Sequence, residues 1–291
     1  EGALMPGVLT ILLALVLTAS SGEAGTLQSR LDAARAGDTI VVGPGFYPGN
    51  LLLAKQLVLV GVGRPTIHGT GEGSTVTLAA DSCTLRGFRI EHCGTRLVEE
   101  DAGVLVKSNR NLIEDNVLSD ILFGIYFLHA DKNRTVGNRI SGRRSLELGE
   151  RGSGIHIWNS RWNDFAGNVI TDVRDGFYIQ NASHMMIEGN EAYGVRYGLH
   201  YMYADSNTFI ANQFHDNVAG AAIMYSRGIT MRRNEFVRNR GVASFGVLFP
   251  DSQGLTADSN IIADNVTGLF FEGSRNNVFR HNIIAANDAA L

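Results

Sequence analysis

A repeat of 22 residues is the feature that most limits how this chain of 291 residues can fold. Each repeat carries a glycine and, 14 residues later, an asparagine, and this offset holds in seven consecutive repeats. A fixed period of this length is typical of proteins built from stacked coils, in which each coil contacts only its neighbours. The asparagines stand at positions 116, 138, 168, 190, 212, 234, 260 and 282, and the glycines at 124, 154, 176, 198, 220, 246 and 268.

Apolar residues alternate after each repeated glycine, which predicts a strand with one face turned inward. Another inward row lies two residues after each repeated asparagine, from Ile140 to Ile284. Further asparagines share registers, Asn207 with Asn133, Asn163 and Asn277, and Asn217 with Asn239, Asn265 and Asn287, so their amides can bond along the stack. The two rows after the glycines are Ile125, Ile155, Phe177, Leu199, Ala221, Val247 and Leu269, and Phe127, Ile157, Ile179, Tyr201, Ile223, Phe249 and Phe271.

Short strands with glycine and asparagine corners favour an all-β fold, a right-handed single-stranded parallel β-helix with about 22 residues per coil. A leucine-rich repeat has a compatible period, but its L-x-x-L-x-L-x-x-N pattern is missing. Insertions near residues 142–152 and 239–245 both fall between an asparagine and the next glycine, so they should leave from one edge of the stack.

The two ends of the chain differ from the coils. Thr26–Ala36 has helical spacing, so we expect residues 25–60 to form a short N-terminal capping helix and the first strands, and residues 61–291 to form the coils. The sequence stops partway through a coil, and we expect further coils to follow. Residues 1–24 resemble an incomplete signal peptide, with the apolar stretch Leu9–Leu17 but no basic residue before it; a buried N-terminal helix or strand is the alternative.

Composition excludes one class of function. The hydrophobic content of 44% and charged content of 19% are those of a globular protein with a core, and the formal net charge is −4. A protein that binds nucleic acid through its surface charge would carry a basic surplus, so no nucleic-acid partner is expected. Cys83 and Cys93 are predicted to be buried free thiols rather than a disulfide, because ten residues within one coil often place two sulfurs on different walls.

The outward face of the strand after each glycine carries unusual residues. In successive coils its first column reads Tyr126, His156, Tyr178, His200 and Ala222, and its second reads Leu128, Trp158, Gln180, Met202 and Met224. A solvated face would carry Ser, Thr, Lys and Glu instead. A face of aromatics, histidines and methionines is expected to be covered or to bind something, and we predict a partner-docking surface at Tyr126, His156, Trp158 and Tyr178.

Three of the outward residues form a candidate metal site. His200 and Met202 share one face of a strand, and Met224 is the counterpart of Met202 in the next coil. An imidazole and two thioethers are soft donors that suit Cu(I) rather than Zn²⁺, Mg²⁺ or Ca²⁺. The alternative is that the methionines only pack beneath a loop or a partner.

A sugar-binding or sugar-cleaving groove is a second interpretation of the aromatic face. Such chemistry needs clustered carboxylates or an acid and base beside a cation. Asp172, Arg174 and Asp175 lie close together in sequence, but both acids could serve only to cap a turn. A polysaccharide lyase, hydrolase or epimerase, or a carbohydrate-binding module, therefore remains the alternative to a protein that is not an enzyme.

Five segments in order make the chain resemble a known family. They are AGDTIVVGPGFY (Ala36–Tyr47), GIHIWN (Gly154–Asn159), RDGFY (Arg174–Tyr178), RYGLHYMY (Arg196–Tyr203) and AGAAIMYS (Ala219–Ser226). They resemble the NosD family, the periplasmic β-helix proteins of nitrous oxide reductase maturation. The resemblance implies export through a signal peptide, no catalytic residues and a role in assembling the copper–sulfur centre of that reductase. It also implies three partners: an ABC transporter made of a membrane subunit and an ATPase, a lipid-anchored copper chaperone, and the reductase itself.

Overall fold

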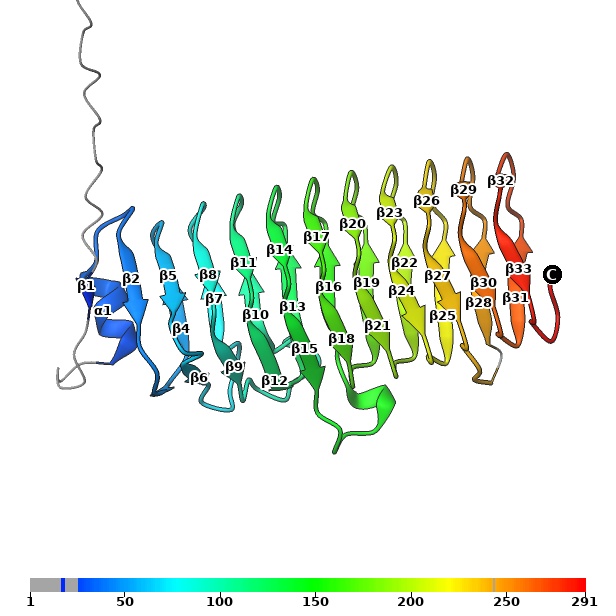
Figure 1. The fold of residues 1–291 in the computed structure, drawn as a ribbon. Helices are drawn as coiled ribbons and strands as arrows, with labels where there is room; N and C mark the ends of the chain where they lie inside the picture. The colour runs from blue at the N-terminus through cyan, green and yellow to red at the C-terminus, as the bar shows by residue number, and fades with distance from the viewer. Residues whose placement is uncertain (1–16, 19–25, 243) are drawn as a thin grey trace, which may run out of the picture.

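The computed structural model describes residues 17–18, 26–242 and 244–291, which form one continuous stack of coils (Figure 1). Every pairing between strands is parallel, and each strand pairs with its equivalents in the coils before and after it. The predicted parallel β-helix is therefore confirmed. The predicted signal segment, residues 1–24, lies outside the described residues, except that the backbone of Leu17–Thr18 pairs with Ile40 and Val41.

Three sheets form the walls of the stack. The first has 12 strands: β1 (Leu17–Thr18), β2 (Thr39–Val42), β5 (Val58–Gly61), β8 (Thr84–Arg86), β11 (Leu112–Glu114), β14 (Arg134–Val136), β17 (Asp164–Ala166), β20 (Met186–Glu188), β23 (Thr208–Ile210), β26 (Thr230–Arg232), β29 (Thr256–Asp258) and β32 (Val278–Arg280).

The second sheet contains the strands predicted after each glycine and has 10 members: β4 (Leu51–Leu53), β7 (Val76–Leu78), β10 (Ala102–Val106), β13 (Phe123–Leu128), β16 (Ile155–Trp158), β19 (Asp175–Gln180), β22 (Tyr197–Met202), β25 (Ala219–Met224), β28 (Phe245–Pro250) and β31 (Thr267–Glu272).

The third sheet has 11 strands: β3 (Phe46–Pro48), β6 (Thr66–His68), β9 (Arg89–Glu91), β12 (Val117–Ile121), β15 (Arg139–Gly142), β18 (Val169–Thr171), β21 (Glu191–Tyr193), β24 (Gln213–His215), β27 (Glu235–Val237), β30 (Ile261–Ala263) and β33 (Ile283–Ala285).

The predicted inward rows form the core. All members of the first row are buried, and those of the second are buried from Phe127 to Phe249, whereas Phe271 in the last described coil is partly exposed. The repeated glycines are required where adjacent coils approach closely. A Cβ on Gly176 would lie 2.6 Å from the carbonyl oxygen of Gly198, so any other residue would push the coils apart.

A column of asparagines, beginning at Asn116, forms hydrogen bonds between successive coils at one corner of the stack. In the column from Asn116 to Asn282, each Oδ1 after the first accepts hydrogen bonds at 2.9 to 3.0 Å from the backbone N–H and the Nδ2 of the preceding asparagine. The Nδ2 groups also donate to backbone carbonyls, as from Asn212 to Ile187 at 2.8 Å. The repeat asparagines are thus structural, because they satisfy backbone groups that the corner would otherwise bury unpaired.

The capping helix and the insertions lie where the sequence placed them. Helix α1 (Leu27–Ala33) sits at the N-terminal end of the stack, and the hydroxyl of Thr26 accepts a hydrogen bond from the N–H of Ser29 (Figure 1). The insertion between β15 and β16, with the short 3₁₀ helix η1 (Leu148–Glu150), leaves the stack at the same corner as the smaller one between β27 and β28 (Figure 1). None of the described helices has the length and apolar character needed to cross a membrane.

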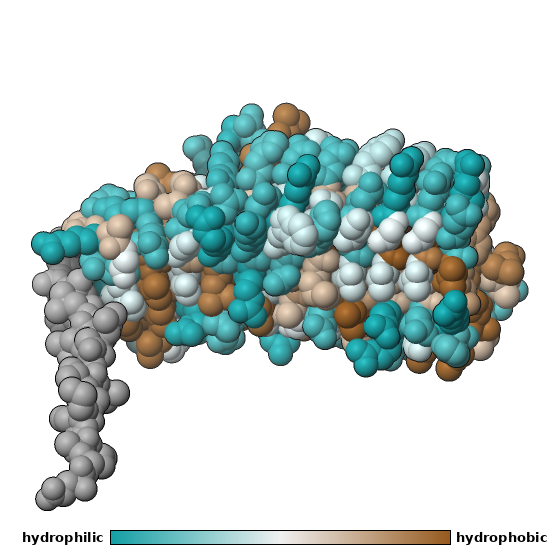
Figure 2. All heavy atoms as spheres, turned by 90° about the horizontal axis from the view of Figure 1, so that it is seen from above, coloured by the Kyte–Doolittle hydropathy of each residue, from teal (hydrophilic) through white to brown (hydrophobic). Residues whose placement is uncertain are grey.

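The surface is mixed in polarity, and the two cysteines are unpaired. Figure 2 shows hydrophilic side chains over most of the face seen from above, with hydrophobic ones in separate small patches. Cys83 and Cys93 are both free and buried, as predicted. Burial raises the pKa of the Cys93 thiol to about 11, so this sulfur is protonated and unreactive at neutral pH.

Candidate functional site

The outward columns of the second sheet form the ladder that the sequence predicted. Tyr126, His156, Tyr178, His200 and Ala222 occupy equivalent positions in consecutive strands from β13 to β25. Their rings contact one another in order, with centroid separations of 4.7 Å, 4.5 Å and 4.9 Å along the first four residues. Gln180, Met202 and Met224 are likewise in register beside them.

A buried carboxylate organises the His200 end of this ladder. Asp175, the first residue of β19, is fully buried and accepts two hydrogen bonds from the Arg196 guanidinium, at 2.9 Å from Nε and 2.7 Å from Nη2. Its Oδ2 also lies 3.2 Å from Nδ1 of His200. The sequence interpretation of Asp175 as a turn cap missed this network, in which three residues from two coils converge.

The protonation of Asp175 follows from these contacts. Burial raises the pKa of the carboxyl group, but the hydrogen bonds from His200 and Arg196 and their charges outweigh burial and hold it below its ordinary value. Asp175 is therefore an anion at neutral pH. Nδ1 of His200 thus faces the carboxylate, with Nη2 of Arg196 3.4 Å away, and Nε2 lies on the other side of the ring.

The residues predicted to bind metal lie at the exposed end of this network. His200, Met202 and Met224 are all partly buried, and Met202 pairs in register with Met224. Nε2 of His200 forms no hydrogen bond with any residue that the structure describes. The next residues, Tyr203 and Tyr225, stack with centroids 5.0 Å apart and are 54% and 46% exposed. Sequence reasoning did not select this tyrosine pair, although the repeated Met-Tyr step in adjacent coils could have signalled it.

The predicted docking residues occupy different environments. Tyr126 and His156 are buried, because Phe123 packs against both rings and Glu100, from the loop after β9, lies near the Tyr126 hydroxyl. Trp158 is partly buried against the core, and Tyr178 donates a hydrogen bond to Gln180 at 2.6 Å. The part of the ladder nearest the N-terminus is thus covered by the chain itself, and the accessible part begins near Tyr178.

His156 is an unusual member of the ladder. Neither of its ring nitrogens has a hydrogen-bond partner, although the side chain is almost completely enclosed between Tyr126 and Tyr178. Burial, followed by repulsion from Arg174, lowers the pKa of His156 from 6.5 to about 3. The ring is consequently neutral at physiological pH and behaves as a buried aromatic group.

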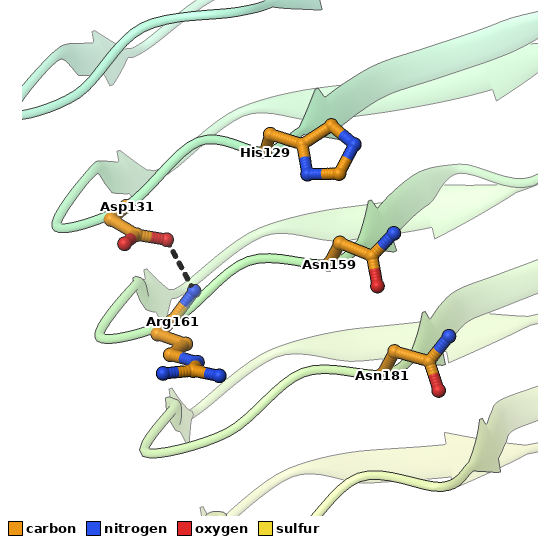
Figure 3. A pocket seen from close by; sticks show the side chains of 5 residues that line it. All are labelled: His129, Asp131, Asn159, Arg161 and Asn181. Atoms are coloured by element: carbon orange, nitrogen blue, oxygen red, sulfur yellow. Dashed lines mark hydrogen bonds between the residues drawn. The ribbon is translucent and has the colours of Figure 1, made fainter.

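A polar hollow of about 550 Å³ opens at the corner that follows β13, β16 and β19, and bears on the sugar interpretation (Figure 3). It is lined by His129, Asp131, Asn159, Arg161 and Asn181, and Oδ1 of Asp131 accepts a hydrogen bond at 2.7 Å from the backbone N–H of Arg161. The lining contains a single carboxylate, whereas glycoside hydrolysis uses two. Asp172 and Asp175 form ion pairs with Arg144 and Arg196, respectively.

Several further histidines and methionines lie outside the ladder. His129 and His184 are exposed, and His184 stacks on Trp162 at 4.1 Å. His215 forms ion pairs with Glu191 and Asp216. Met185 is buried whereas its neighbour Met186 is exposed. No group of three or more His, Cys, Asp or Glu side chains suited to a metal occurs in the described part of the chain.

Replacing Asp175 by Asn is expected to destabilise the protein by about 2 to 3 kcal/mol, because Arg196 loses its buried counter-ion. The folded-state pKa of Asp175 is lowered, so its contribution is present above its unfolded pKa and disappears as the pH falls through the folded value. Urea unfolding of both proteins at several pH values measures this difference.

Asp172→Asn is the matched control, because the partner of Asp172, Arg144, is largely exposed. This substitution should lower the free energy of unfolding by less than about 1 kcal/mol. Equal losses for the two variants would contradict the importance of the buried network.

Comparison with solved structures identifies the architectural class. The fold is similar to the A-module of mannuronan C-5 epimerase AlgE6 from Azotobacter vinelandii, with a TM-score of 0.73 and 17% identity over 90% of this chain and 83% of that one. It is also similar to an alginate lyase from Paenibacillus sp. str. FPU-7, with a TM-score of 0.68 and 16% identity over 86% of this chain and 96% of that one. At such low identity these similarities show the fold alone, which is that of a parallel β-helix.

Sequence comparison then gives the family. Residues 136–291 match the family described as "Periplasmic copper-binding protein (NosD)". Over 134 residues the chain is 31% identical to the "Probable ABC transporter binding protein NosD" of Pseudomonas aeruginosa and 28% identical to that of Stutzerimonas stutzeri. Each match covers 45% of this chain and 31% of the relative. Residues 136–291 include the candidate residues His200, Met202 and Met224, and the chain belongs to the NosD family.

Proposed function

We propose that this protein is a periplasmic accessory protein that binds Cu(I) and works with an ABC transporter in maturing the copper–sulfur centre of nitrous oxide reductase. Its partners in this role are the membrane subunit and the ATPase of the transporter, a lipid-anchored copper chaperone, and the reductase. Membership of a family described as copper-binding supports the cargo, and relatives named as ABC transporter binding proteins support the partner. The protein does no chemistry on the cargo beyond binding and release.

The donor set at His200, Met202 and Met224 fits Cu(I). Two thioethers and one imidazole nitrogen are soft donors, and they suit this ion better than a divalent ion that prefers oxygen. A metal-binding histidine usually donates its other ring N–H to a carboxylate, which fixes its orientation. Asp175 occupies that position beside His200, and Arg196 holds Asp175 in place. This carboxylate–histidine contact is the single observation that carries the proposal, because simple packing of the methionines would not require it.

A protein that delivers copper to this site would meet the exposed tyrosine pair first. Tyr203 and Tyr225 follow the two methionines directly and present stacked rings at the surface. Exposed aromatic rings are frequent anchors of protein interfaces. The docking surface is therefore proposed to extend from Tyr178 across the methionines to Tyr203 and Tyr225, with Tyr126 and His156 supporting it from within.

The Met202→Leu/Met224→Leu variant is expected to bind Cu(I) at least about 100-fold more weakly than the wild type. Loss of even a residue that orients a ligand costs about 10- to 100-fold in metal affinity, and this variant loses two donors. Leucine preserves the packing volume of methionine, so the fold should be retained.

Competition with a Cu(I) chelator under anaerobic, reducing conditions measures the affinity. Met186→Leu, which changes an exposed methionine on another sheet, is the control and should bind as the wild type does. Identical Cu(I) affinities for all three proteins would contradict the proposed metal site. The proposed role with the transporter would then be tested by co-purification.

Carbohydrate binding or cleavage is the second candidate function, and the polar hollow at His129 is the observation that favours it. The amides of Asn159 and Asn181 and the guanidinium of Arg161 could bond to sugar hydroxyl or carboxylate groups (Figure 3). Incubation with alginate oligosaccharides, followed by product analysis, tests this function. Cleavage or epimerisation that is lost in His129→Ala would establish an enzyme and overturn the accessory role.

A further inference from the structure

Two arginines occupy equivalent corner positions in neighbouring coils of the second sheet. Arg174 directly precedes β19, Arg196 directly precedes β22, and the backbone N–H of Arg196 bonds to the carbonyl of Arg174 at 2.7 Å. Both guanidinium groups approach the same oxygen atom, Oδ2 of Asp175, which lies 2.7 Å from Nη2 of Arg196 and 3.5 Å from Nε of Arg174. One carboxylate therefore has two positively charged neighbours.

Asp175 satisfies Arg196 but not Arg174. It accepts two hydrogen bonds from Arg196, whereas its separation from Arg174 exceeds the usual hydrogen-bond range of about 2.7 to 3.2 Å. The side chain of Arg174 forms no hydrogen bond within the part of the chain that the structure describes, and its Nε is buried without a partner. A guanidinium is always charged in a protein. Arg174 thus carries a charge without a full counter-ion, which is costly for a partly buried group.

The charge of Arg174 lies beside the outward aromatic ladder. Burial is the main cause of the lowered pKa of His156 and of the raised pKa of Tyr178, and in both cases the charge of Arg174 is the next largest influence. Arg196 lies over the ring of Tyr197, with its guanidinium carbon 4.8 Å from the ring centroid. The two arginine side chains are 24% and 36% exposed, so a small ligand can reach both from solvent.

Other charged side chains near this corner do not supply the missing counter-ion. Asp172 pairs with Arg144 at 2.9 Å. The guanidinium of Arg151 adds a further positive charge, and it bonds only to backbone carbonyls. The ion pairs of Arg174 and Arg196 are both with Asp175, and no other carboxylate is among their described partners. The corner therefore has a surplus of positive charge.

We propose that Arg174 and Arg196 bind a small oxyanion, such as sulfate, on the outward face of the second sheet. Its oxygens accept hydrogen bonds from the terminal nitrogens of Arg174 and from Nη1 of Arg196, while Nε and Nη2 of Arg196 keep their bonds to Asp175. Guanidinium groups match oxyanions in shape as well as in charge, and a tetrahedral anion offers oxygens to both groups at once. The site goes beyond the proposed Cu(I) function, because it binds a ligand of opposite charge through different side chains.

The test is calorimetric titration of the metal-free protein with sulfate and, separately, with acetate, at an ionic strength held constant with chloride. The wild type should bind one sulfate ion. Arg174→Gln should weaken this binding by about tenfold or more, because a charged hydrogen-bond donor is lost. Asp175→Asn should strengthen it by about tenfold, because a competing negative charge is removed from between the two arginines. Tighter binding of acetate than of sulfate would also support the site and would identify a planar carboxylate as its ligand.

Control variants separate this site from general effects of charge and of salt. Arg144→Gln removes a largely exposed arginine from the same corner and should bind sulfate as the wild type does. Met202→Leu/Met224→Leu keeps both arginines, so its sulfate affinity should be unchanged whatever its Cu(I) affinity.

Millimolar sulfate should also raise the thermal unfolding midpoint of Asp175→Asn more than that of Asp175→Asn/Arg174→Gln. The general stabilisation of proteins by sulfate is common to both variants and cancels in this comparison. If the wild type bound neither sulfate nor acetate, or if Arg174→Gln bound them as tightly as the wild type, the proposal would be overturned.

Discussion

Asn212→Ala is expected to lower the free energy of unfolding by about 3 to 5 kcal/mol, although the change deletes only a small polar group. Its Oδ1 accepts hydrogen bonds from the backbone N–H and the Nδ2 of Asn190, and its Nδ2 donates to the carbonyl of Ile187 and to Asn234. The substitution leaves the N–H of Asn190 and the carbonyl of Ile187 buried without partners, at about 1 to 3 kcal/mol each. A cavity at the corner between coils adds to this loss.

Gln213→Ala is the matched control for this prediction, because it removes the neighbouring side-chain amide from an exposed position in the same coil. It should change stability by less than about 0.5 kcal/mol. Urea unfolding followed by circular dichroism compares the two variants with the wild type. A protein of stacked coils can unfold in parts. A separate unfolding transition of Asn212→Ala at a lower urea concentration would therefore also count as the predicted loss of stability. A loss below about 1 kcal/mol would mean that the asparagine column contributes little to stability.

His156→Phe is expected to make the protein markedly more resistant to acid. In the unfolded chain His156 takes up a proton below about pH 6.5, but in the folded protein its pKa is about 3. Between these values the unfolded state binds the extra proton, so stability falls as the pH falls. This one side chain should therefore cost the wild type roughly 4 kcal/mol between pH 6.5 and pH 3, an order-of-magnitude figure.

Phenylalanine removes the titrating group and keeps a ring between Tyr126 and Tyr178. At pH 7 the variant should be as stable as the wild type or slightly more stable, because two buried nitrogens without partners are lost. The measurement is unfolding by urea at pH 7, 5.5, 4.5 and 3.5. His129→Phe, at an exposed position, should retain the acid sensitivity of the wild type. If the free energy of unfolding changed with pH in the same way for the wild type and His156→Phe, the neutral state of the folded His156 ring would be contradicted.

The fold could be predicted almost completely from the sequence, because a stack of coils repeats the same local rules. The 14-residue step from glycine to asparagine set the coil, and alternation after each glycine identified inward residues such as Phe177 and Leu199, which are buried. The amide column of Asn217 also followed from register, as shown by the bonds from Asn239 to Asn265. The column of Asn207 is interrupted, because its neighbours in register are Met185 and Ile229 and its Oδ1 accepts from the backbone N–H of Met185. Strand register in a parallel β-helix carries over from coil to coil, so one correct coil predicts the others.

The candidate site was predictable only in part. Register placed His200, Met202 and Met224 together on the outward face, but it did not show that Asp175 is buried beneath His200. That contact depends on the corner before Gly176, where the side chain of Asp175 turns to the outward side. The burial of Tyr126 and His156 was missed for a related reason. Phe123 and Glu100 cover these two rings. Strand alternation does not predict the path of an insertion or the conformation of a corner, so it could not predict this cover.

The most direct test of the copper proposal is to locate the ion in crystals of the protein grown with Cu(I) under reducing conditions. An anomalous difference map at the copper absorption edge should contain a peak within bonding distance of His200 Nε2 and of the sulfur atoms of Met202 and Met224. Asp175 should still bond to Nδ1 of His200 in that structure. A copper peak elsewhere on the chain, or none in crystals of a protein that binds Cu(I) in solution, would contradict the assignment.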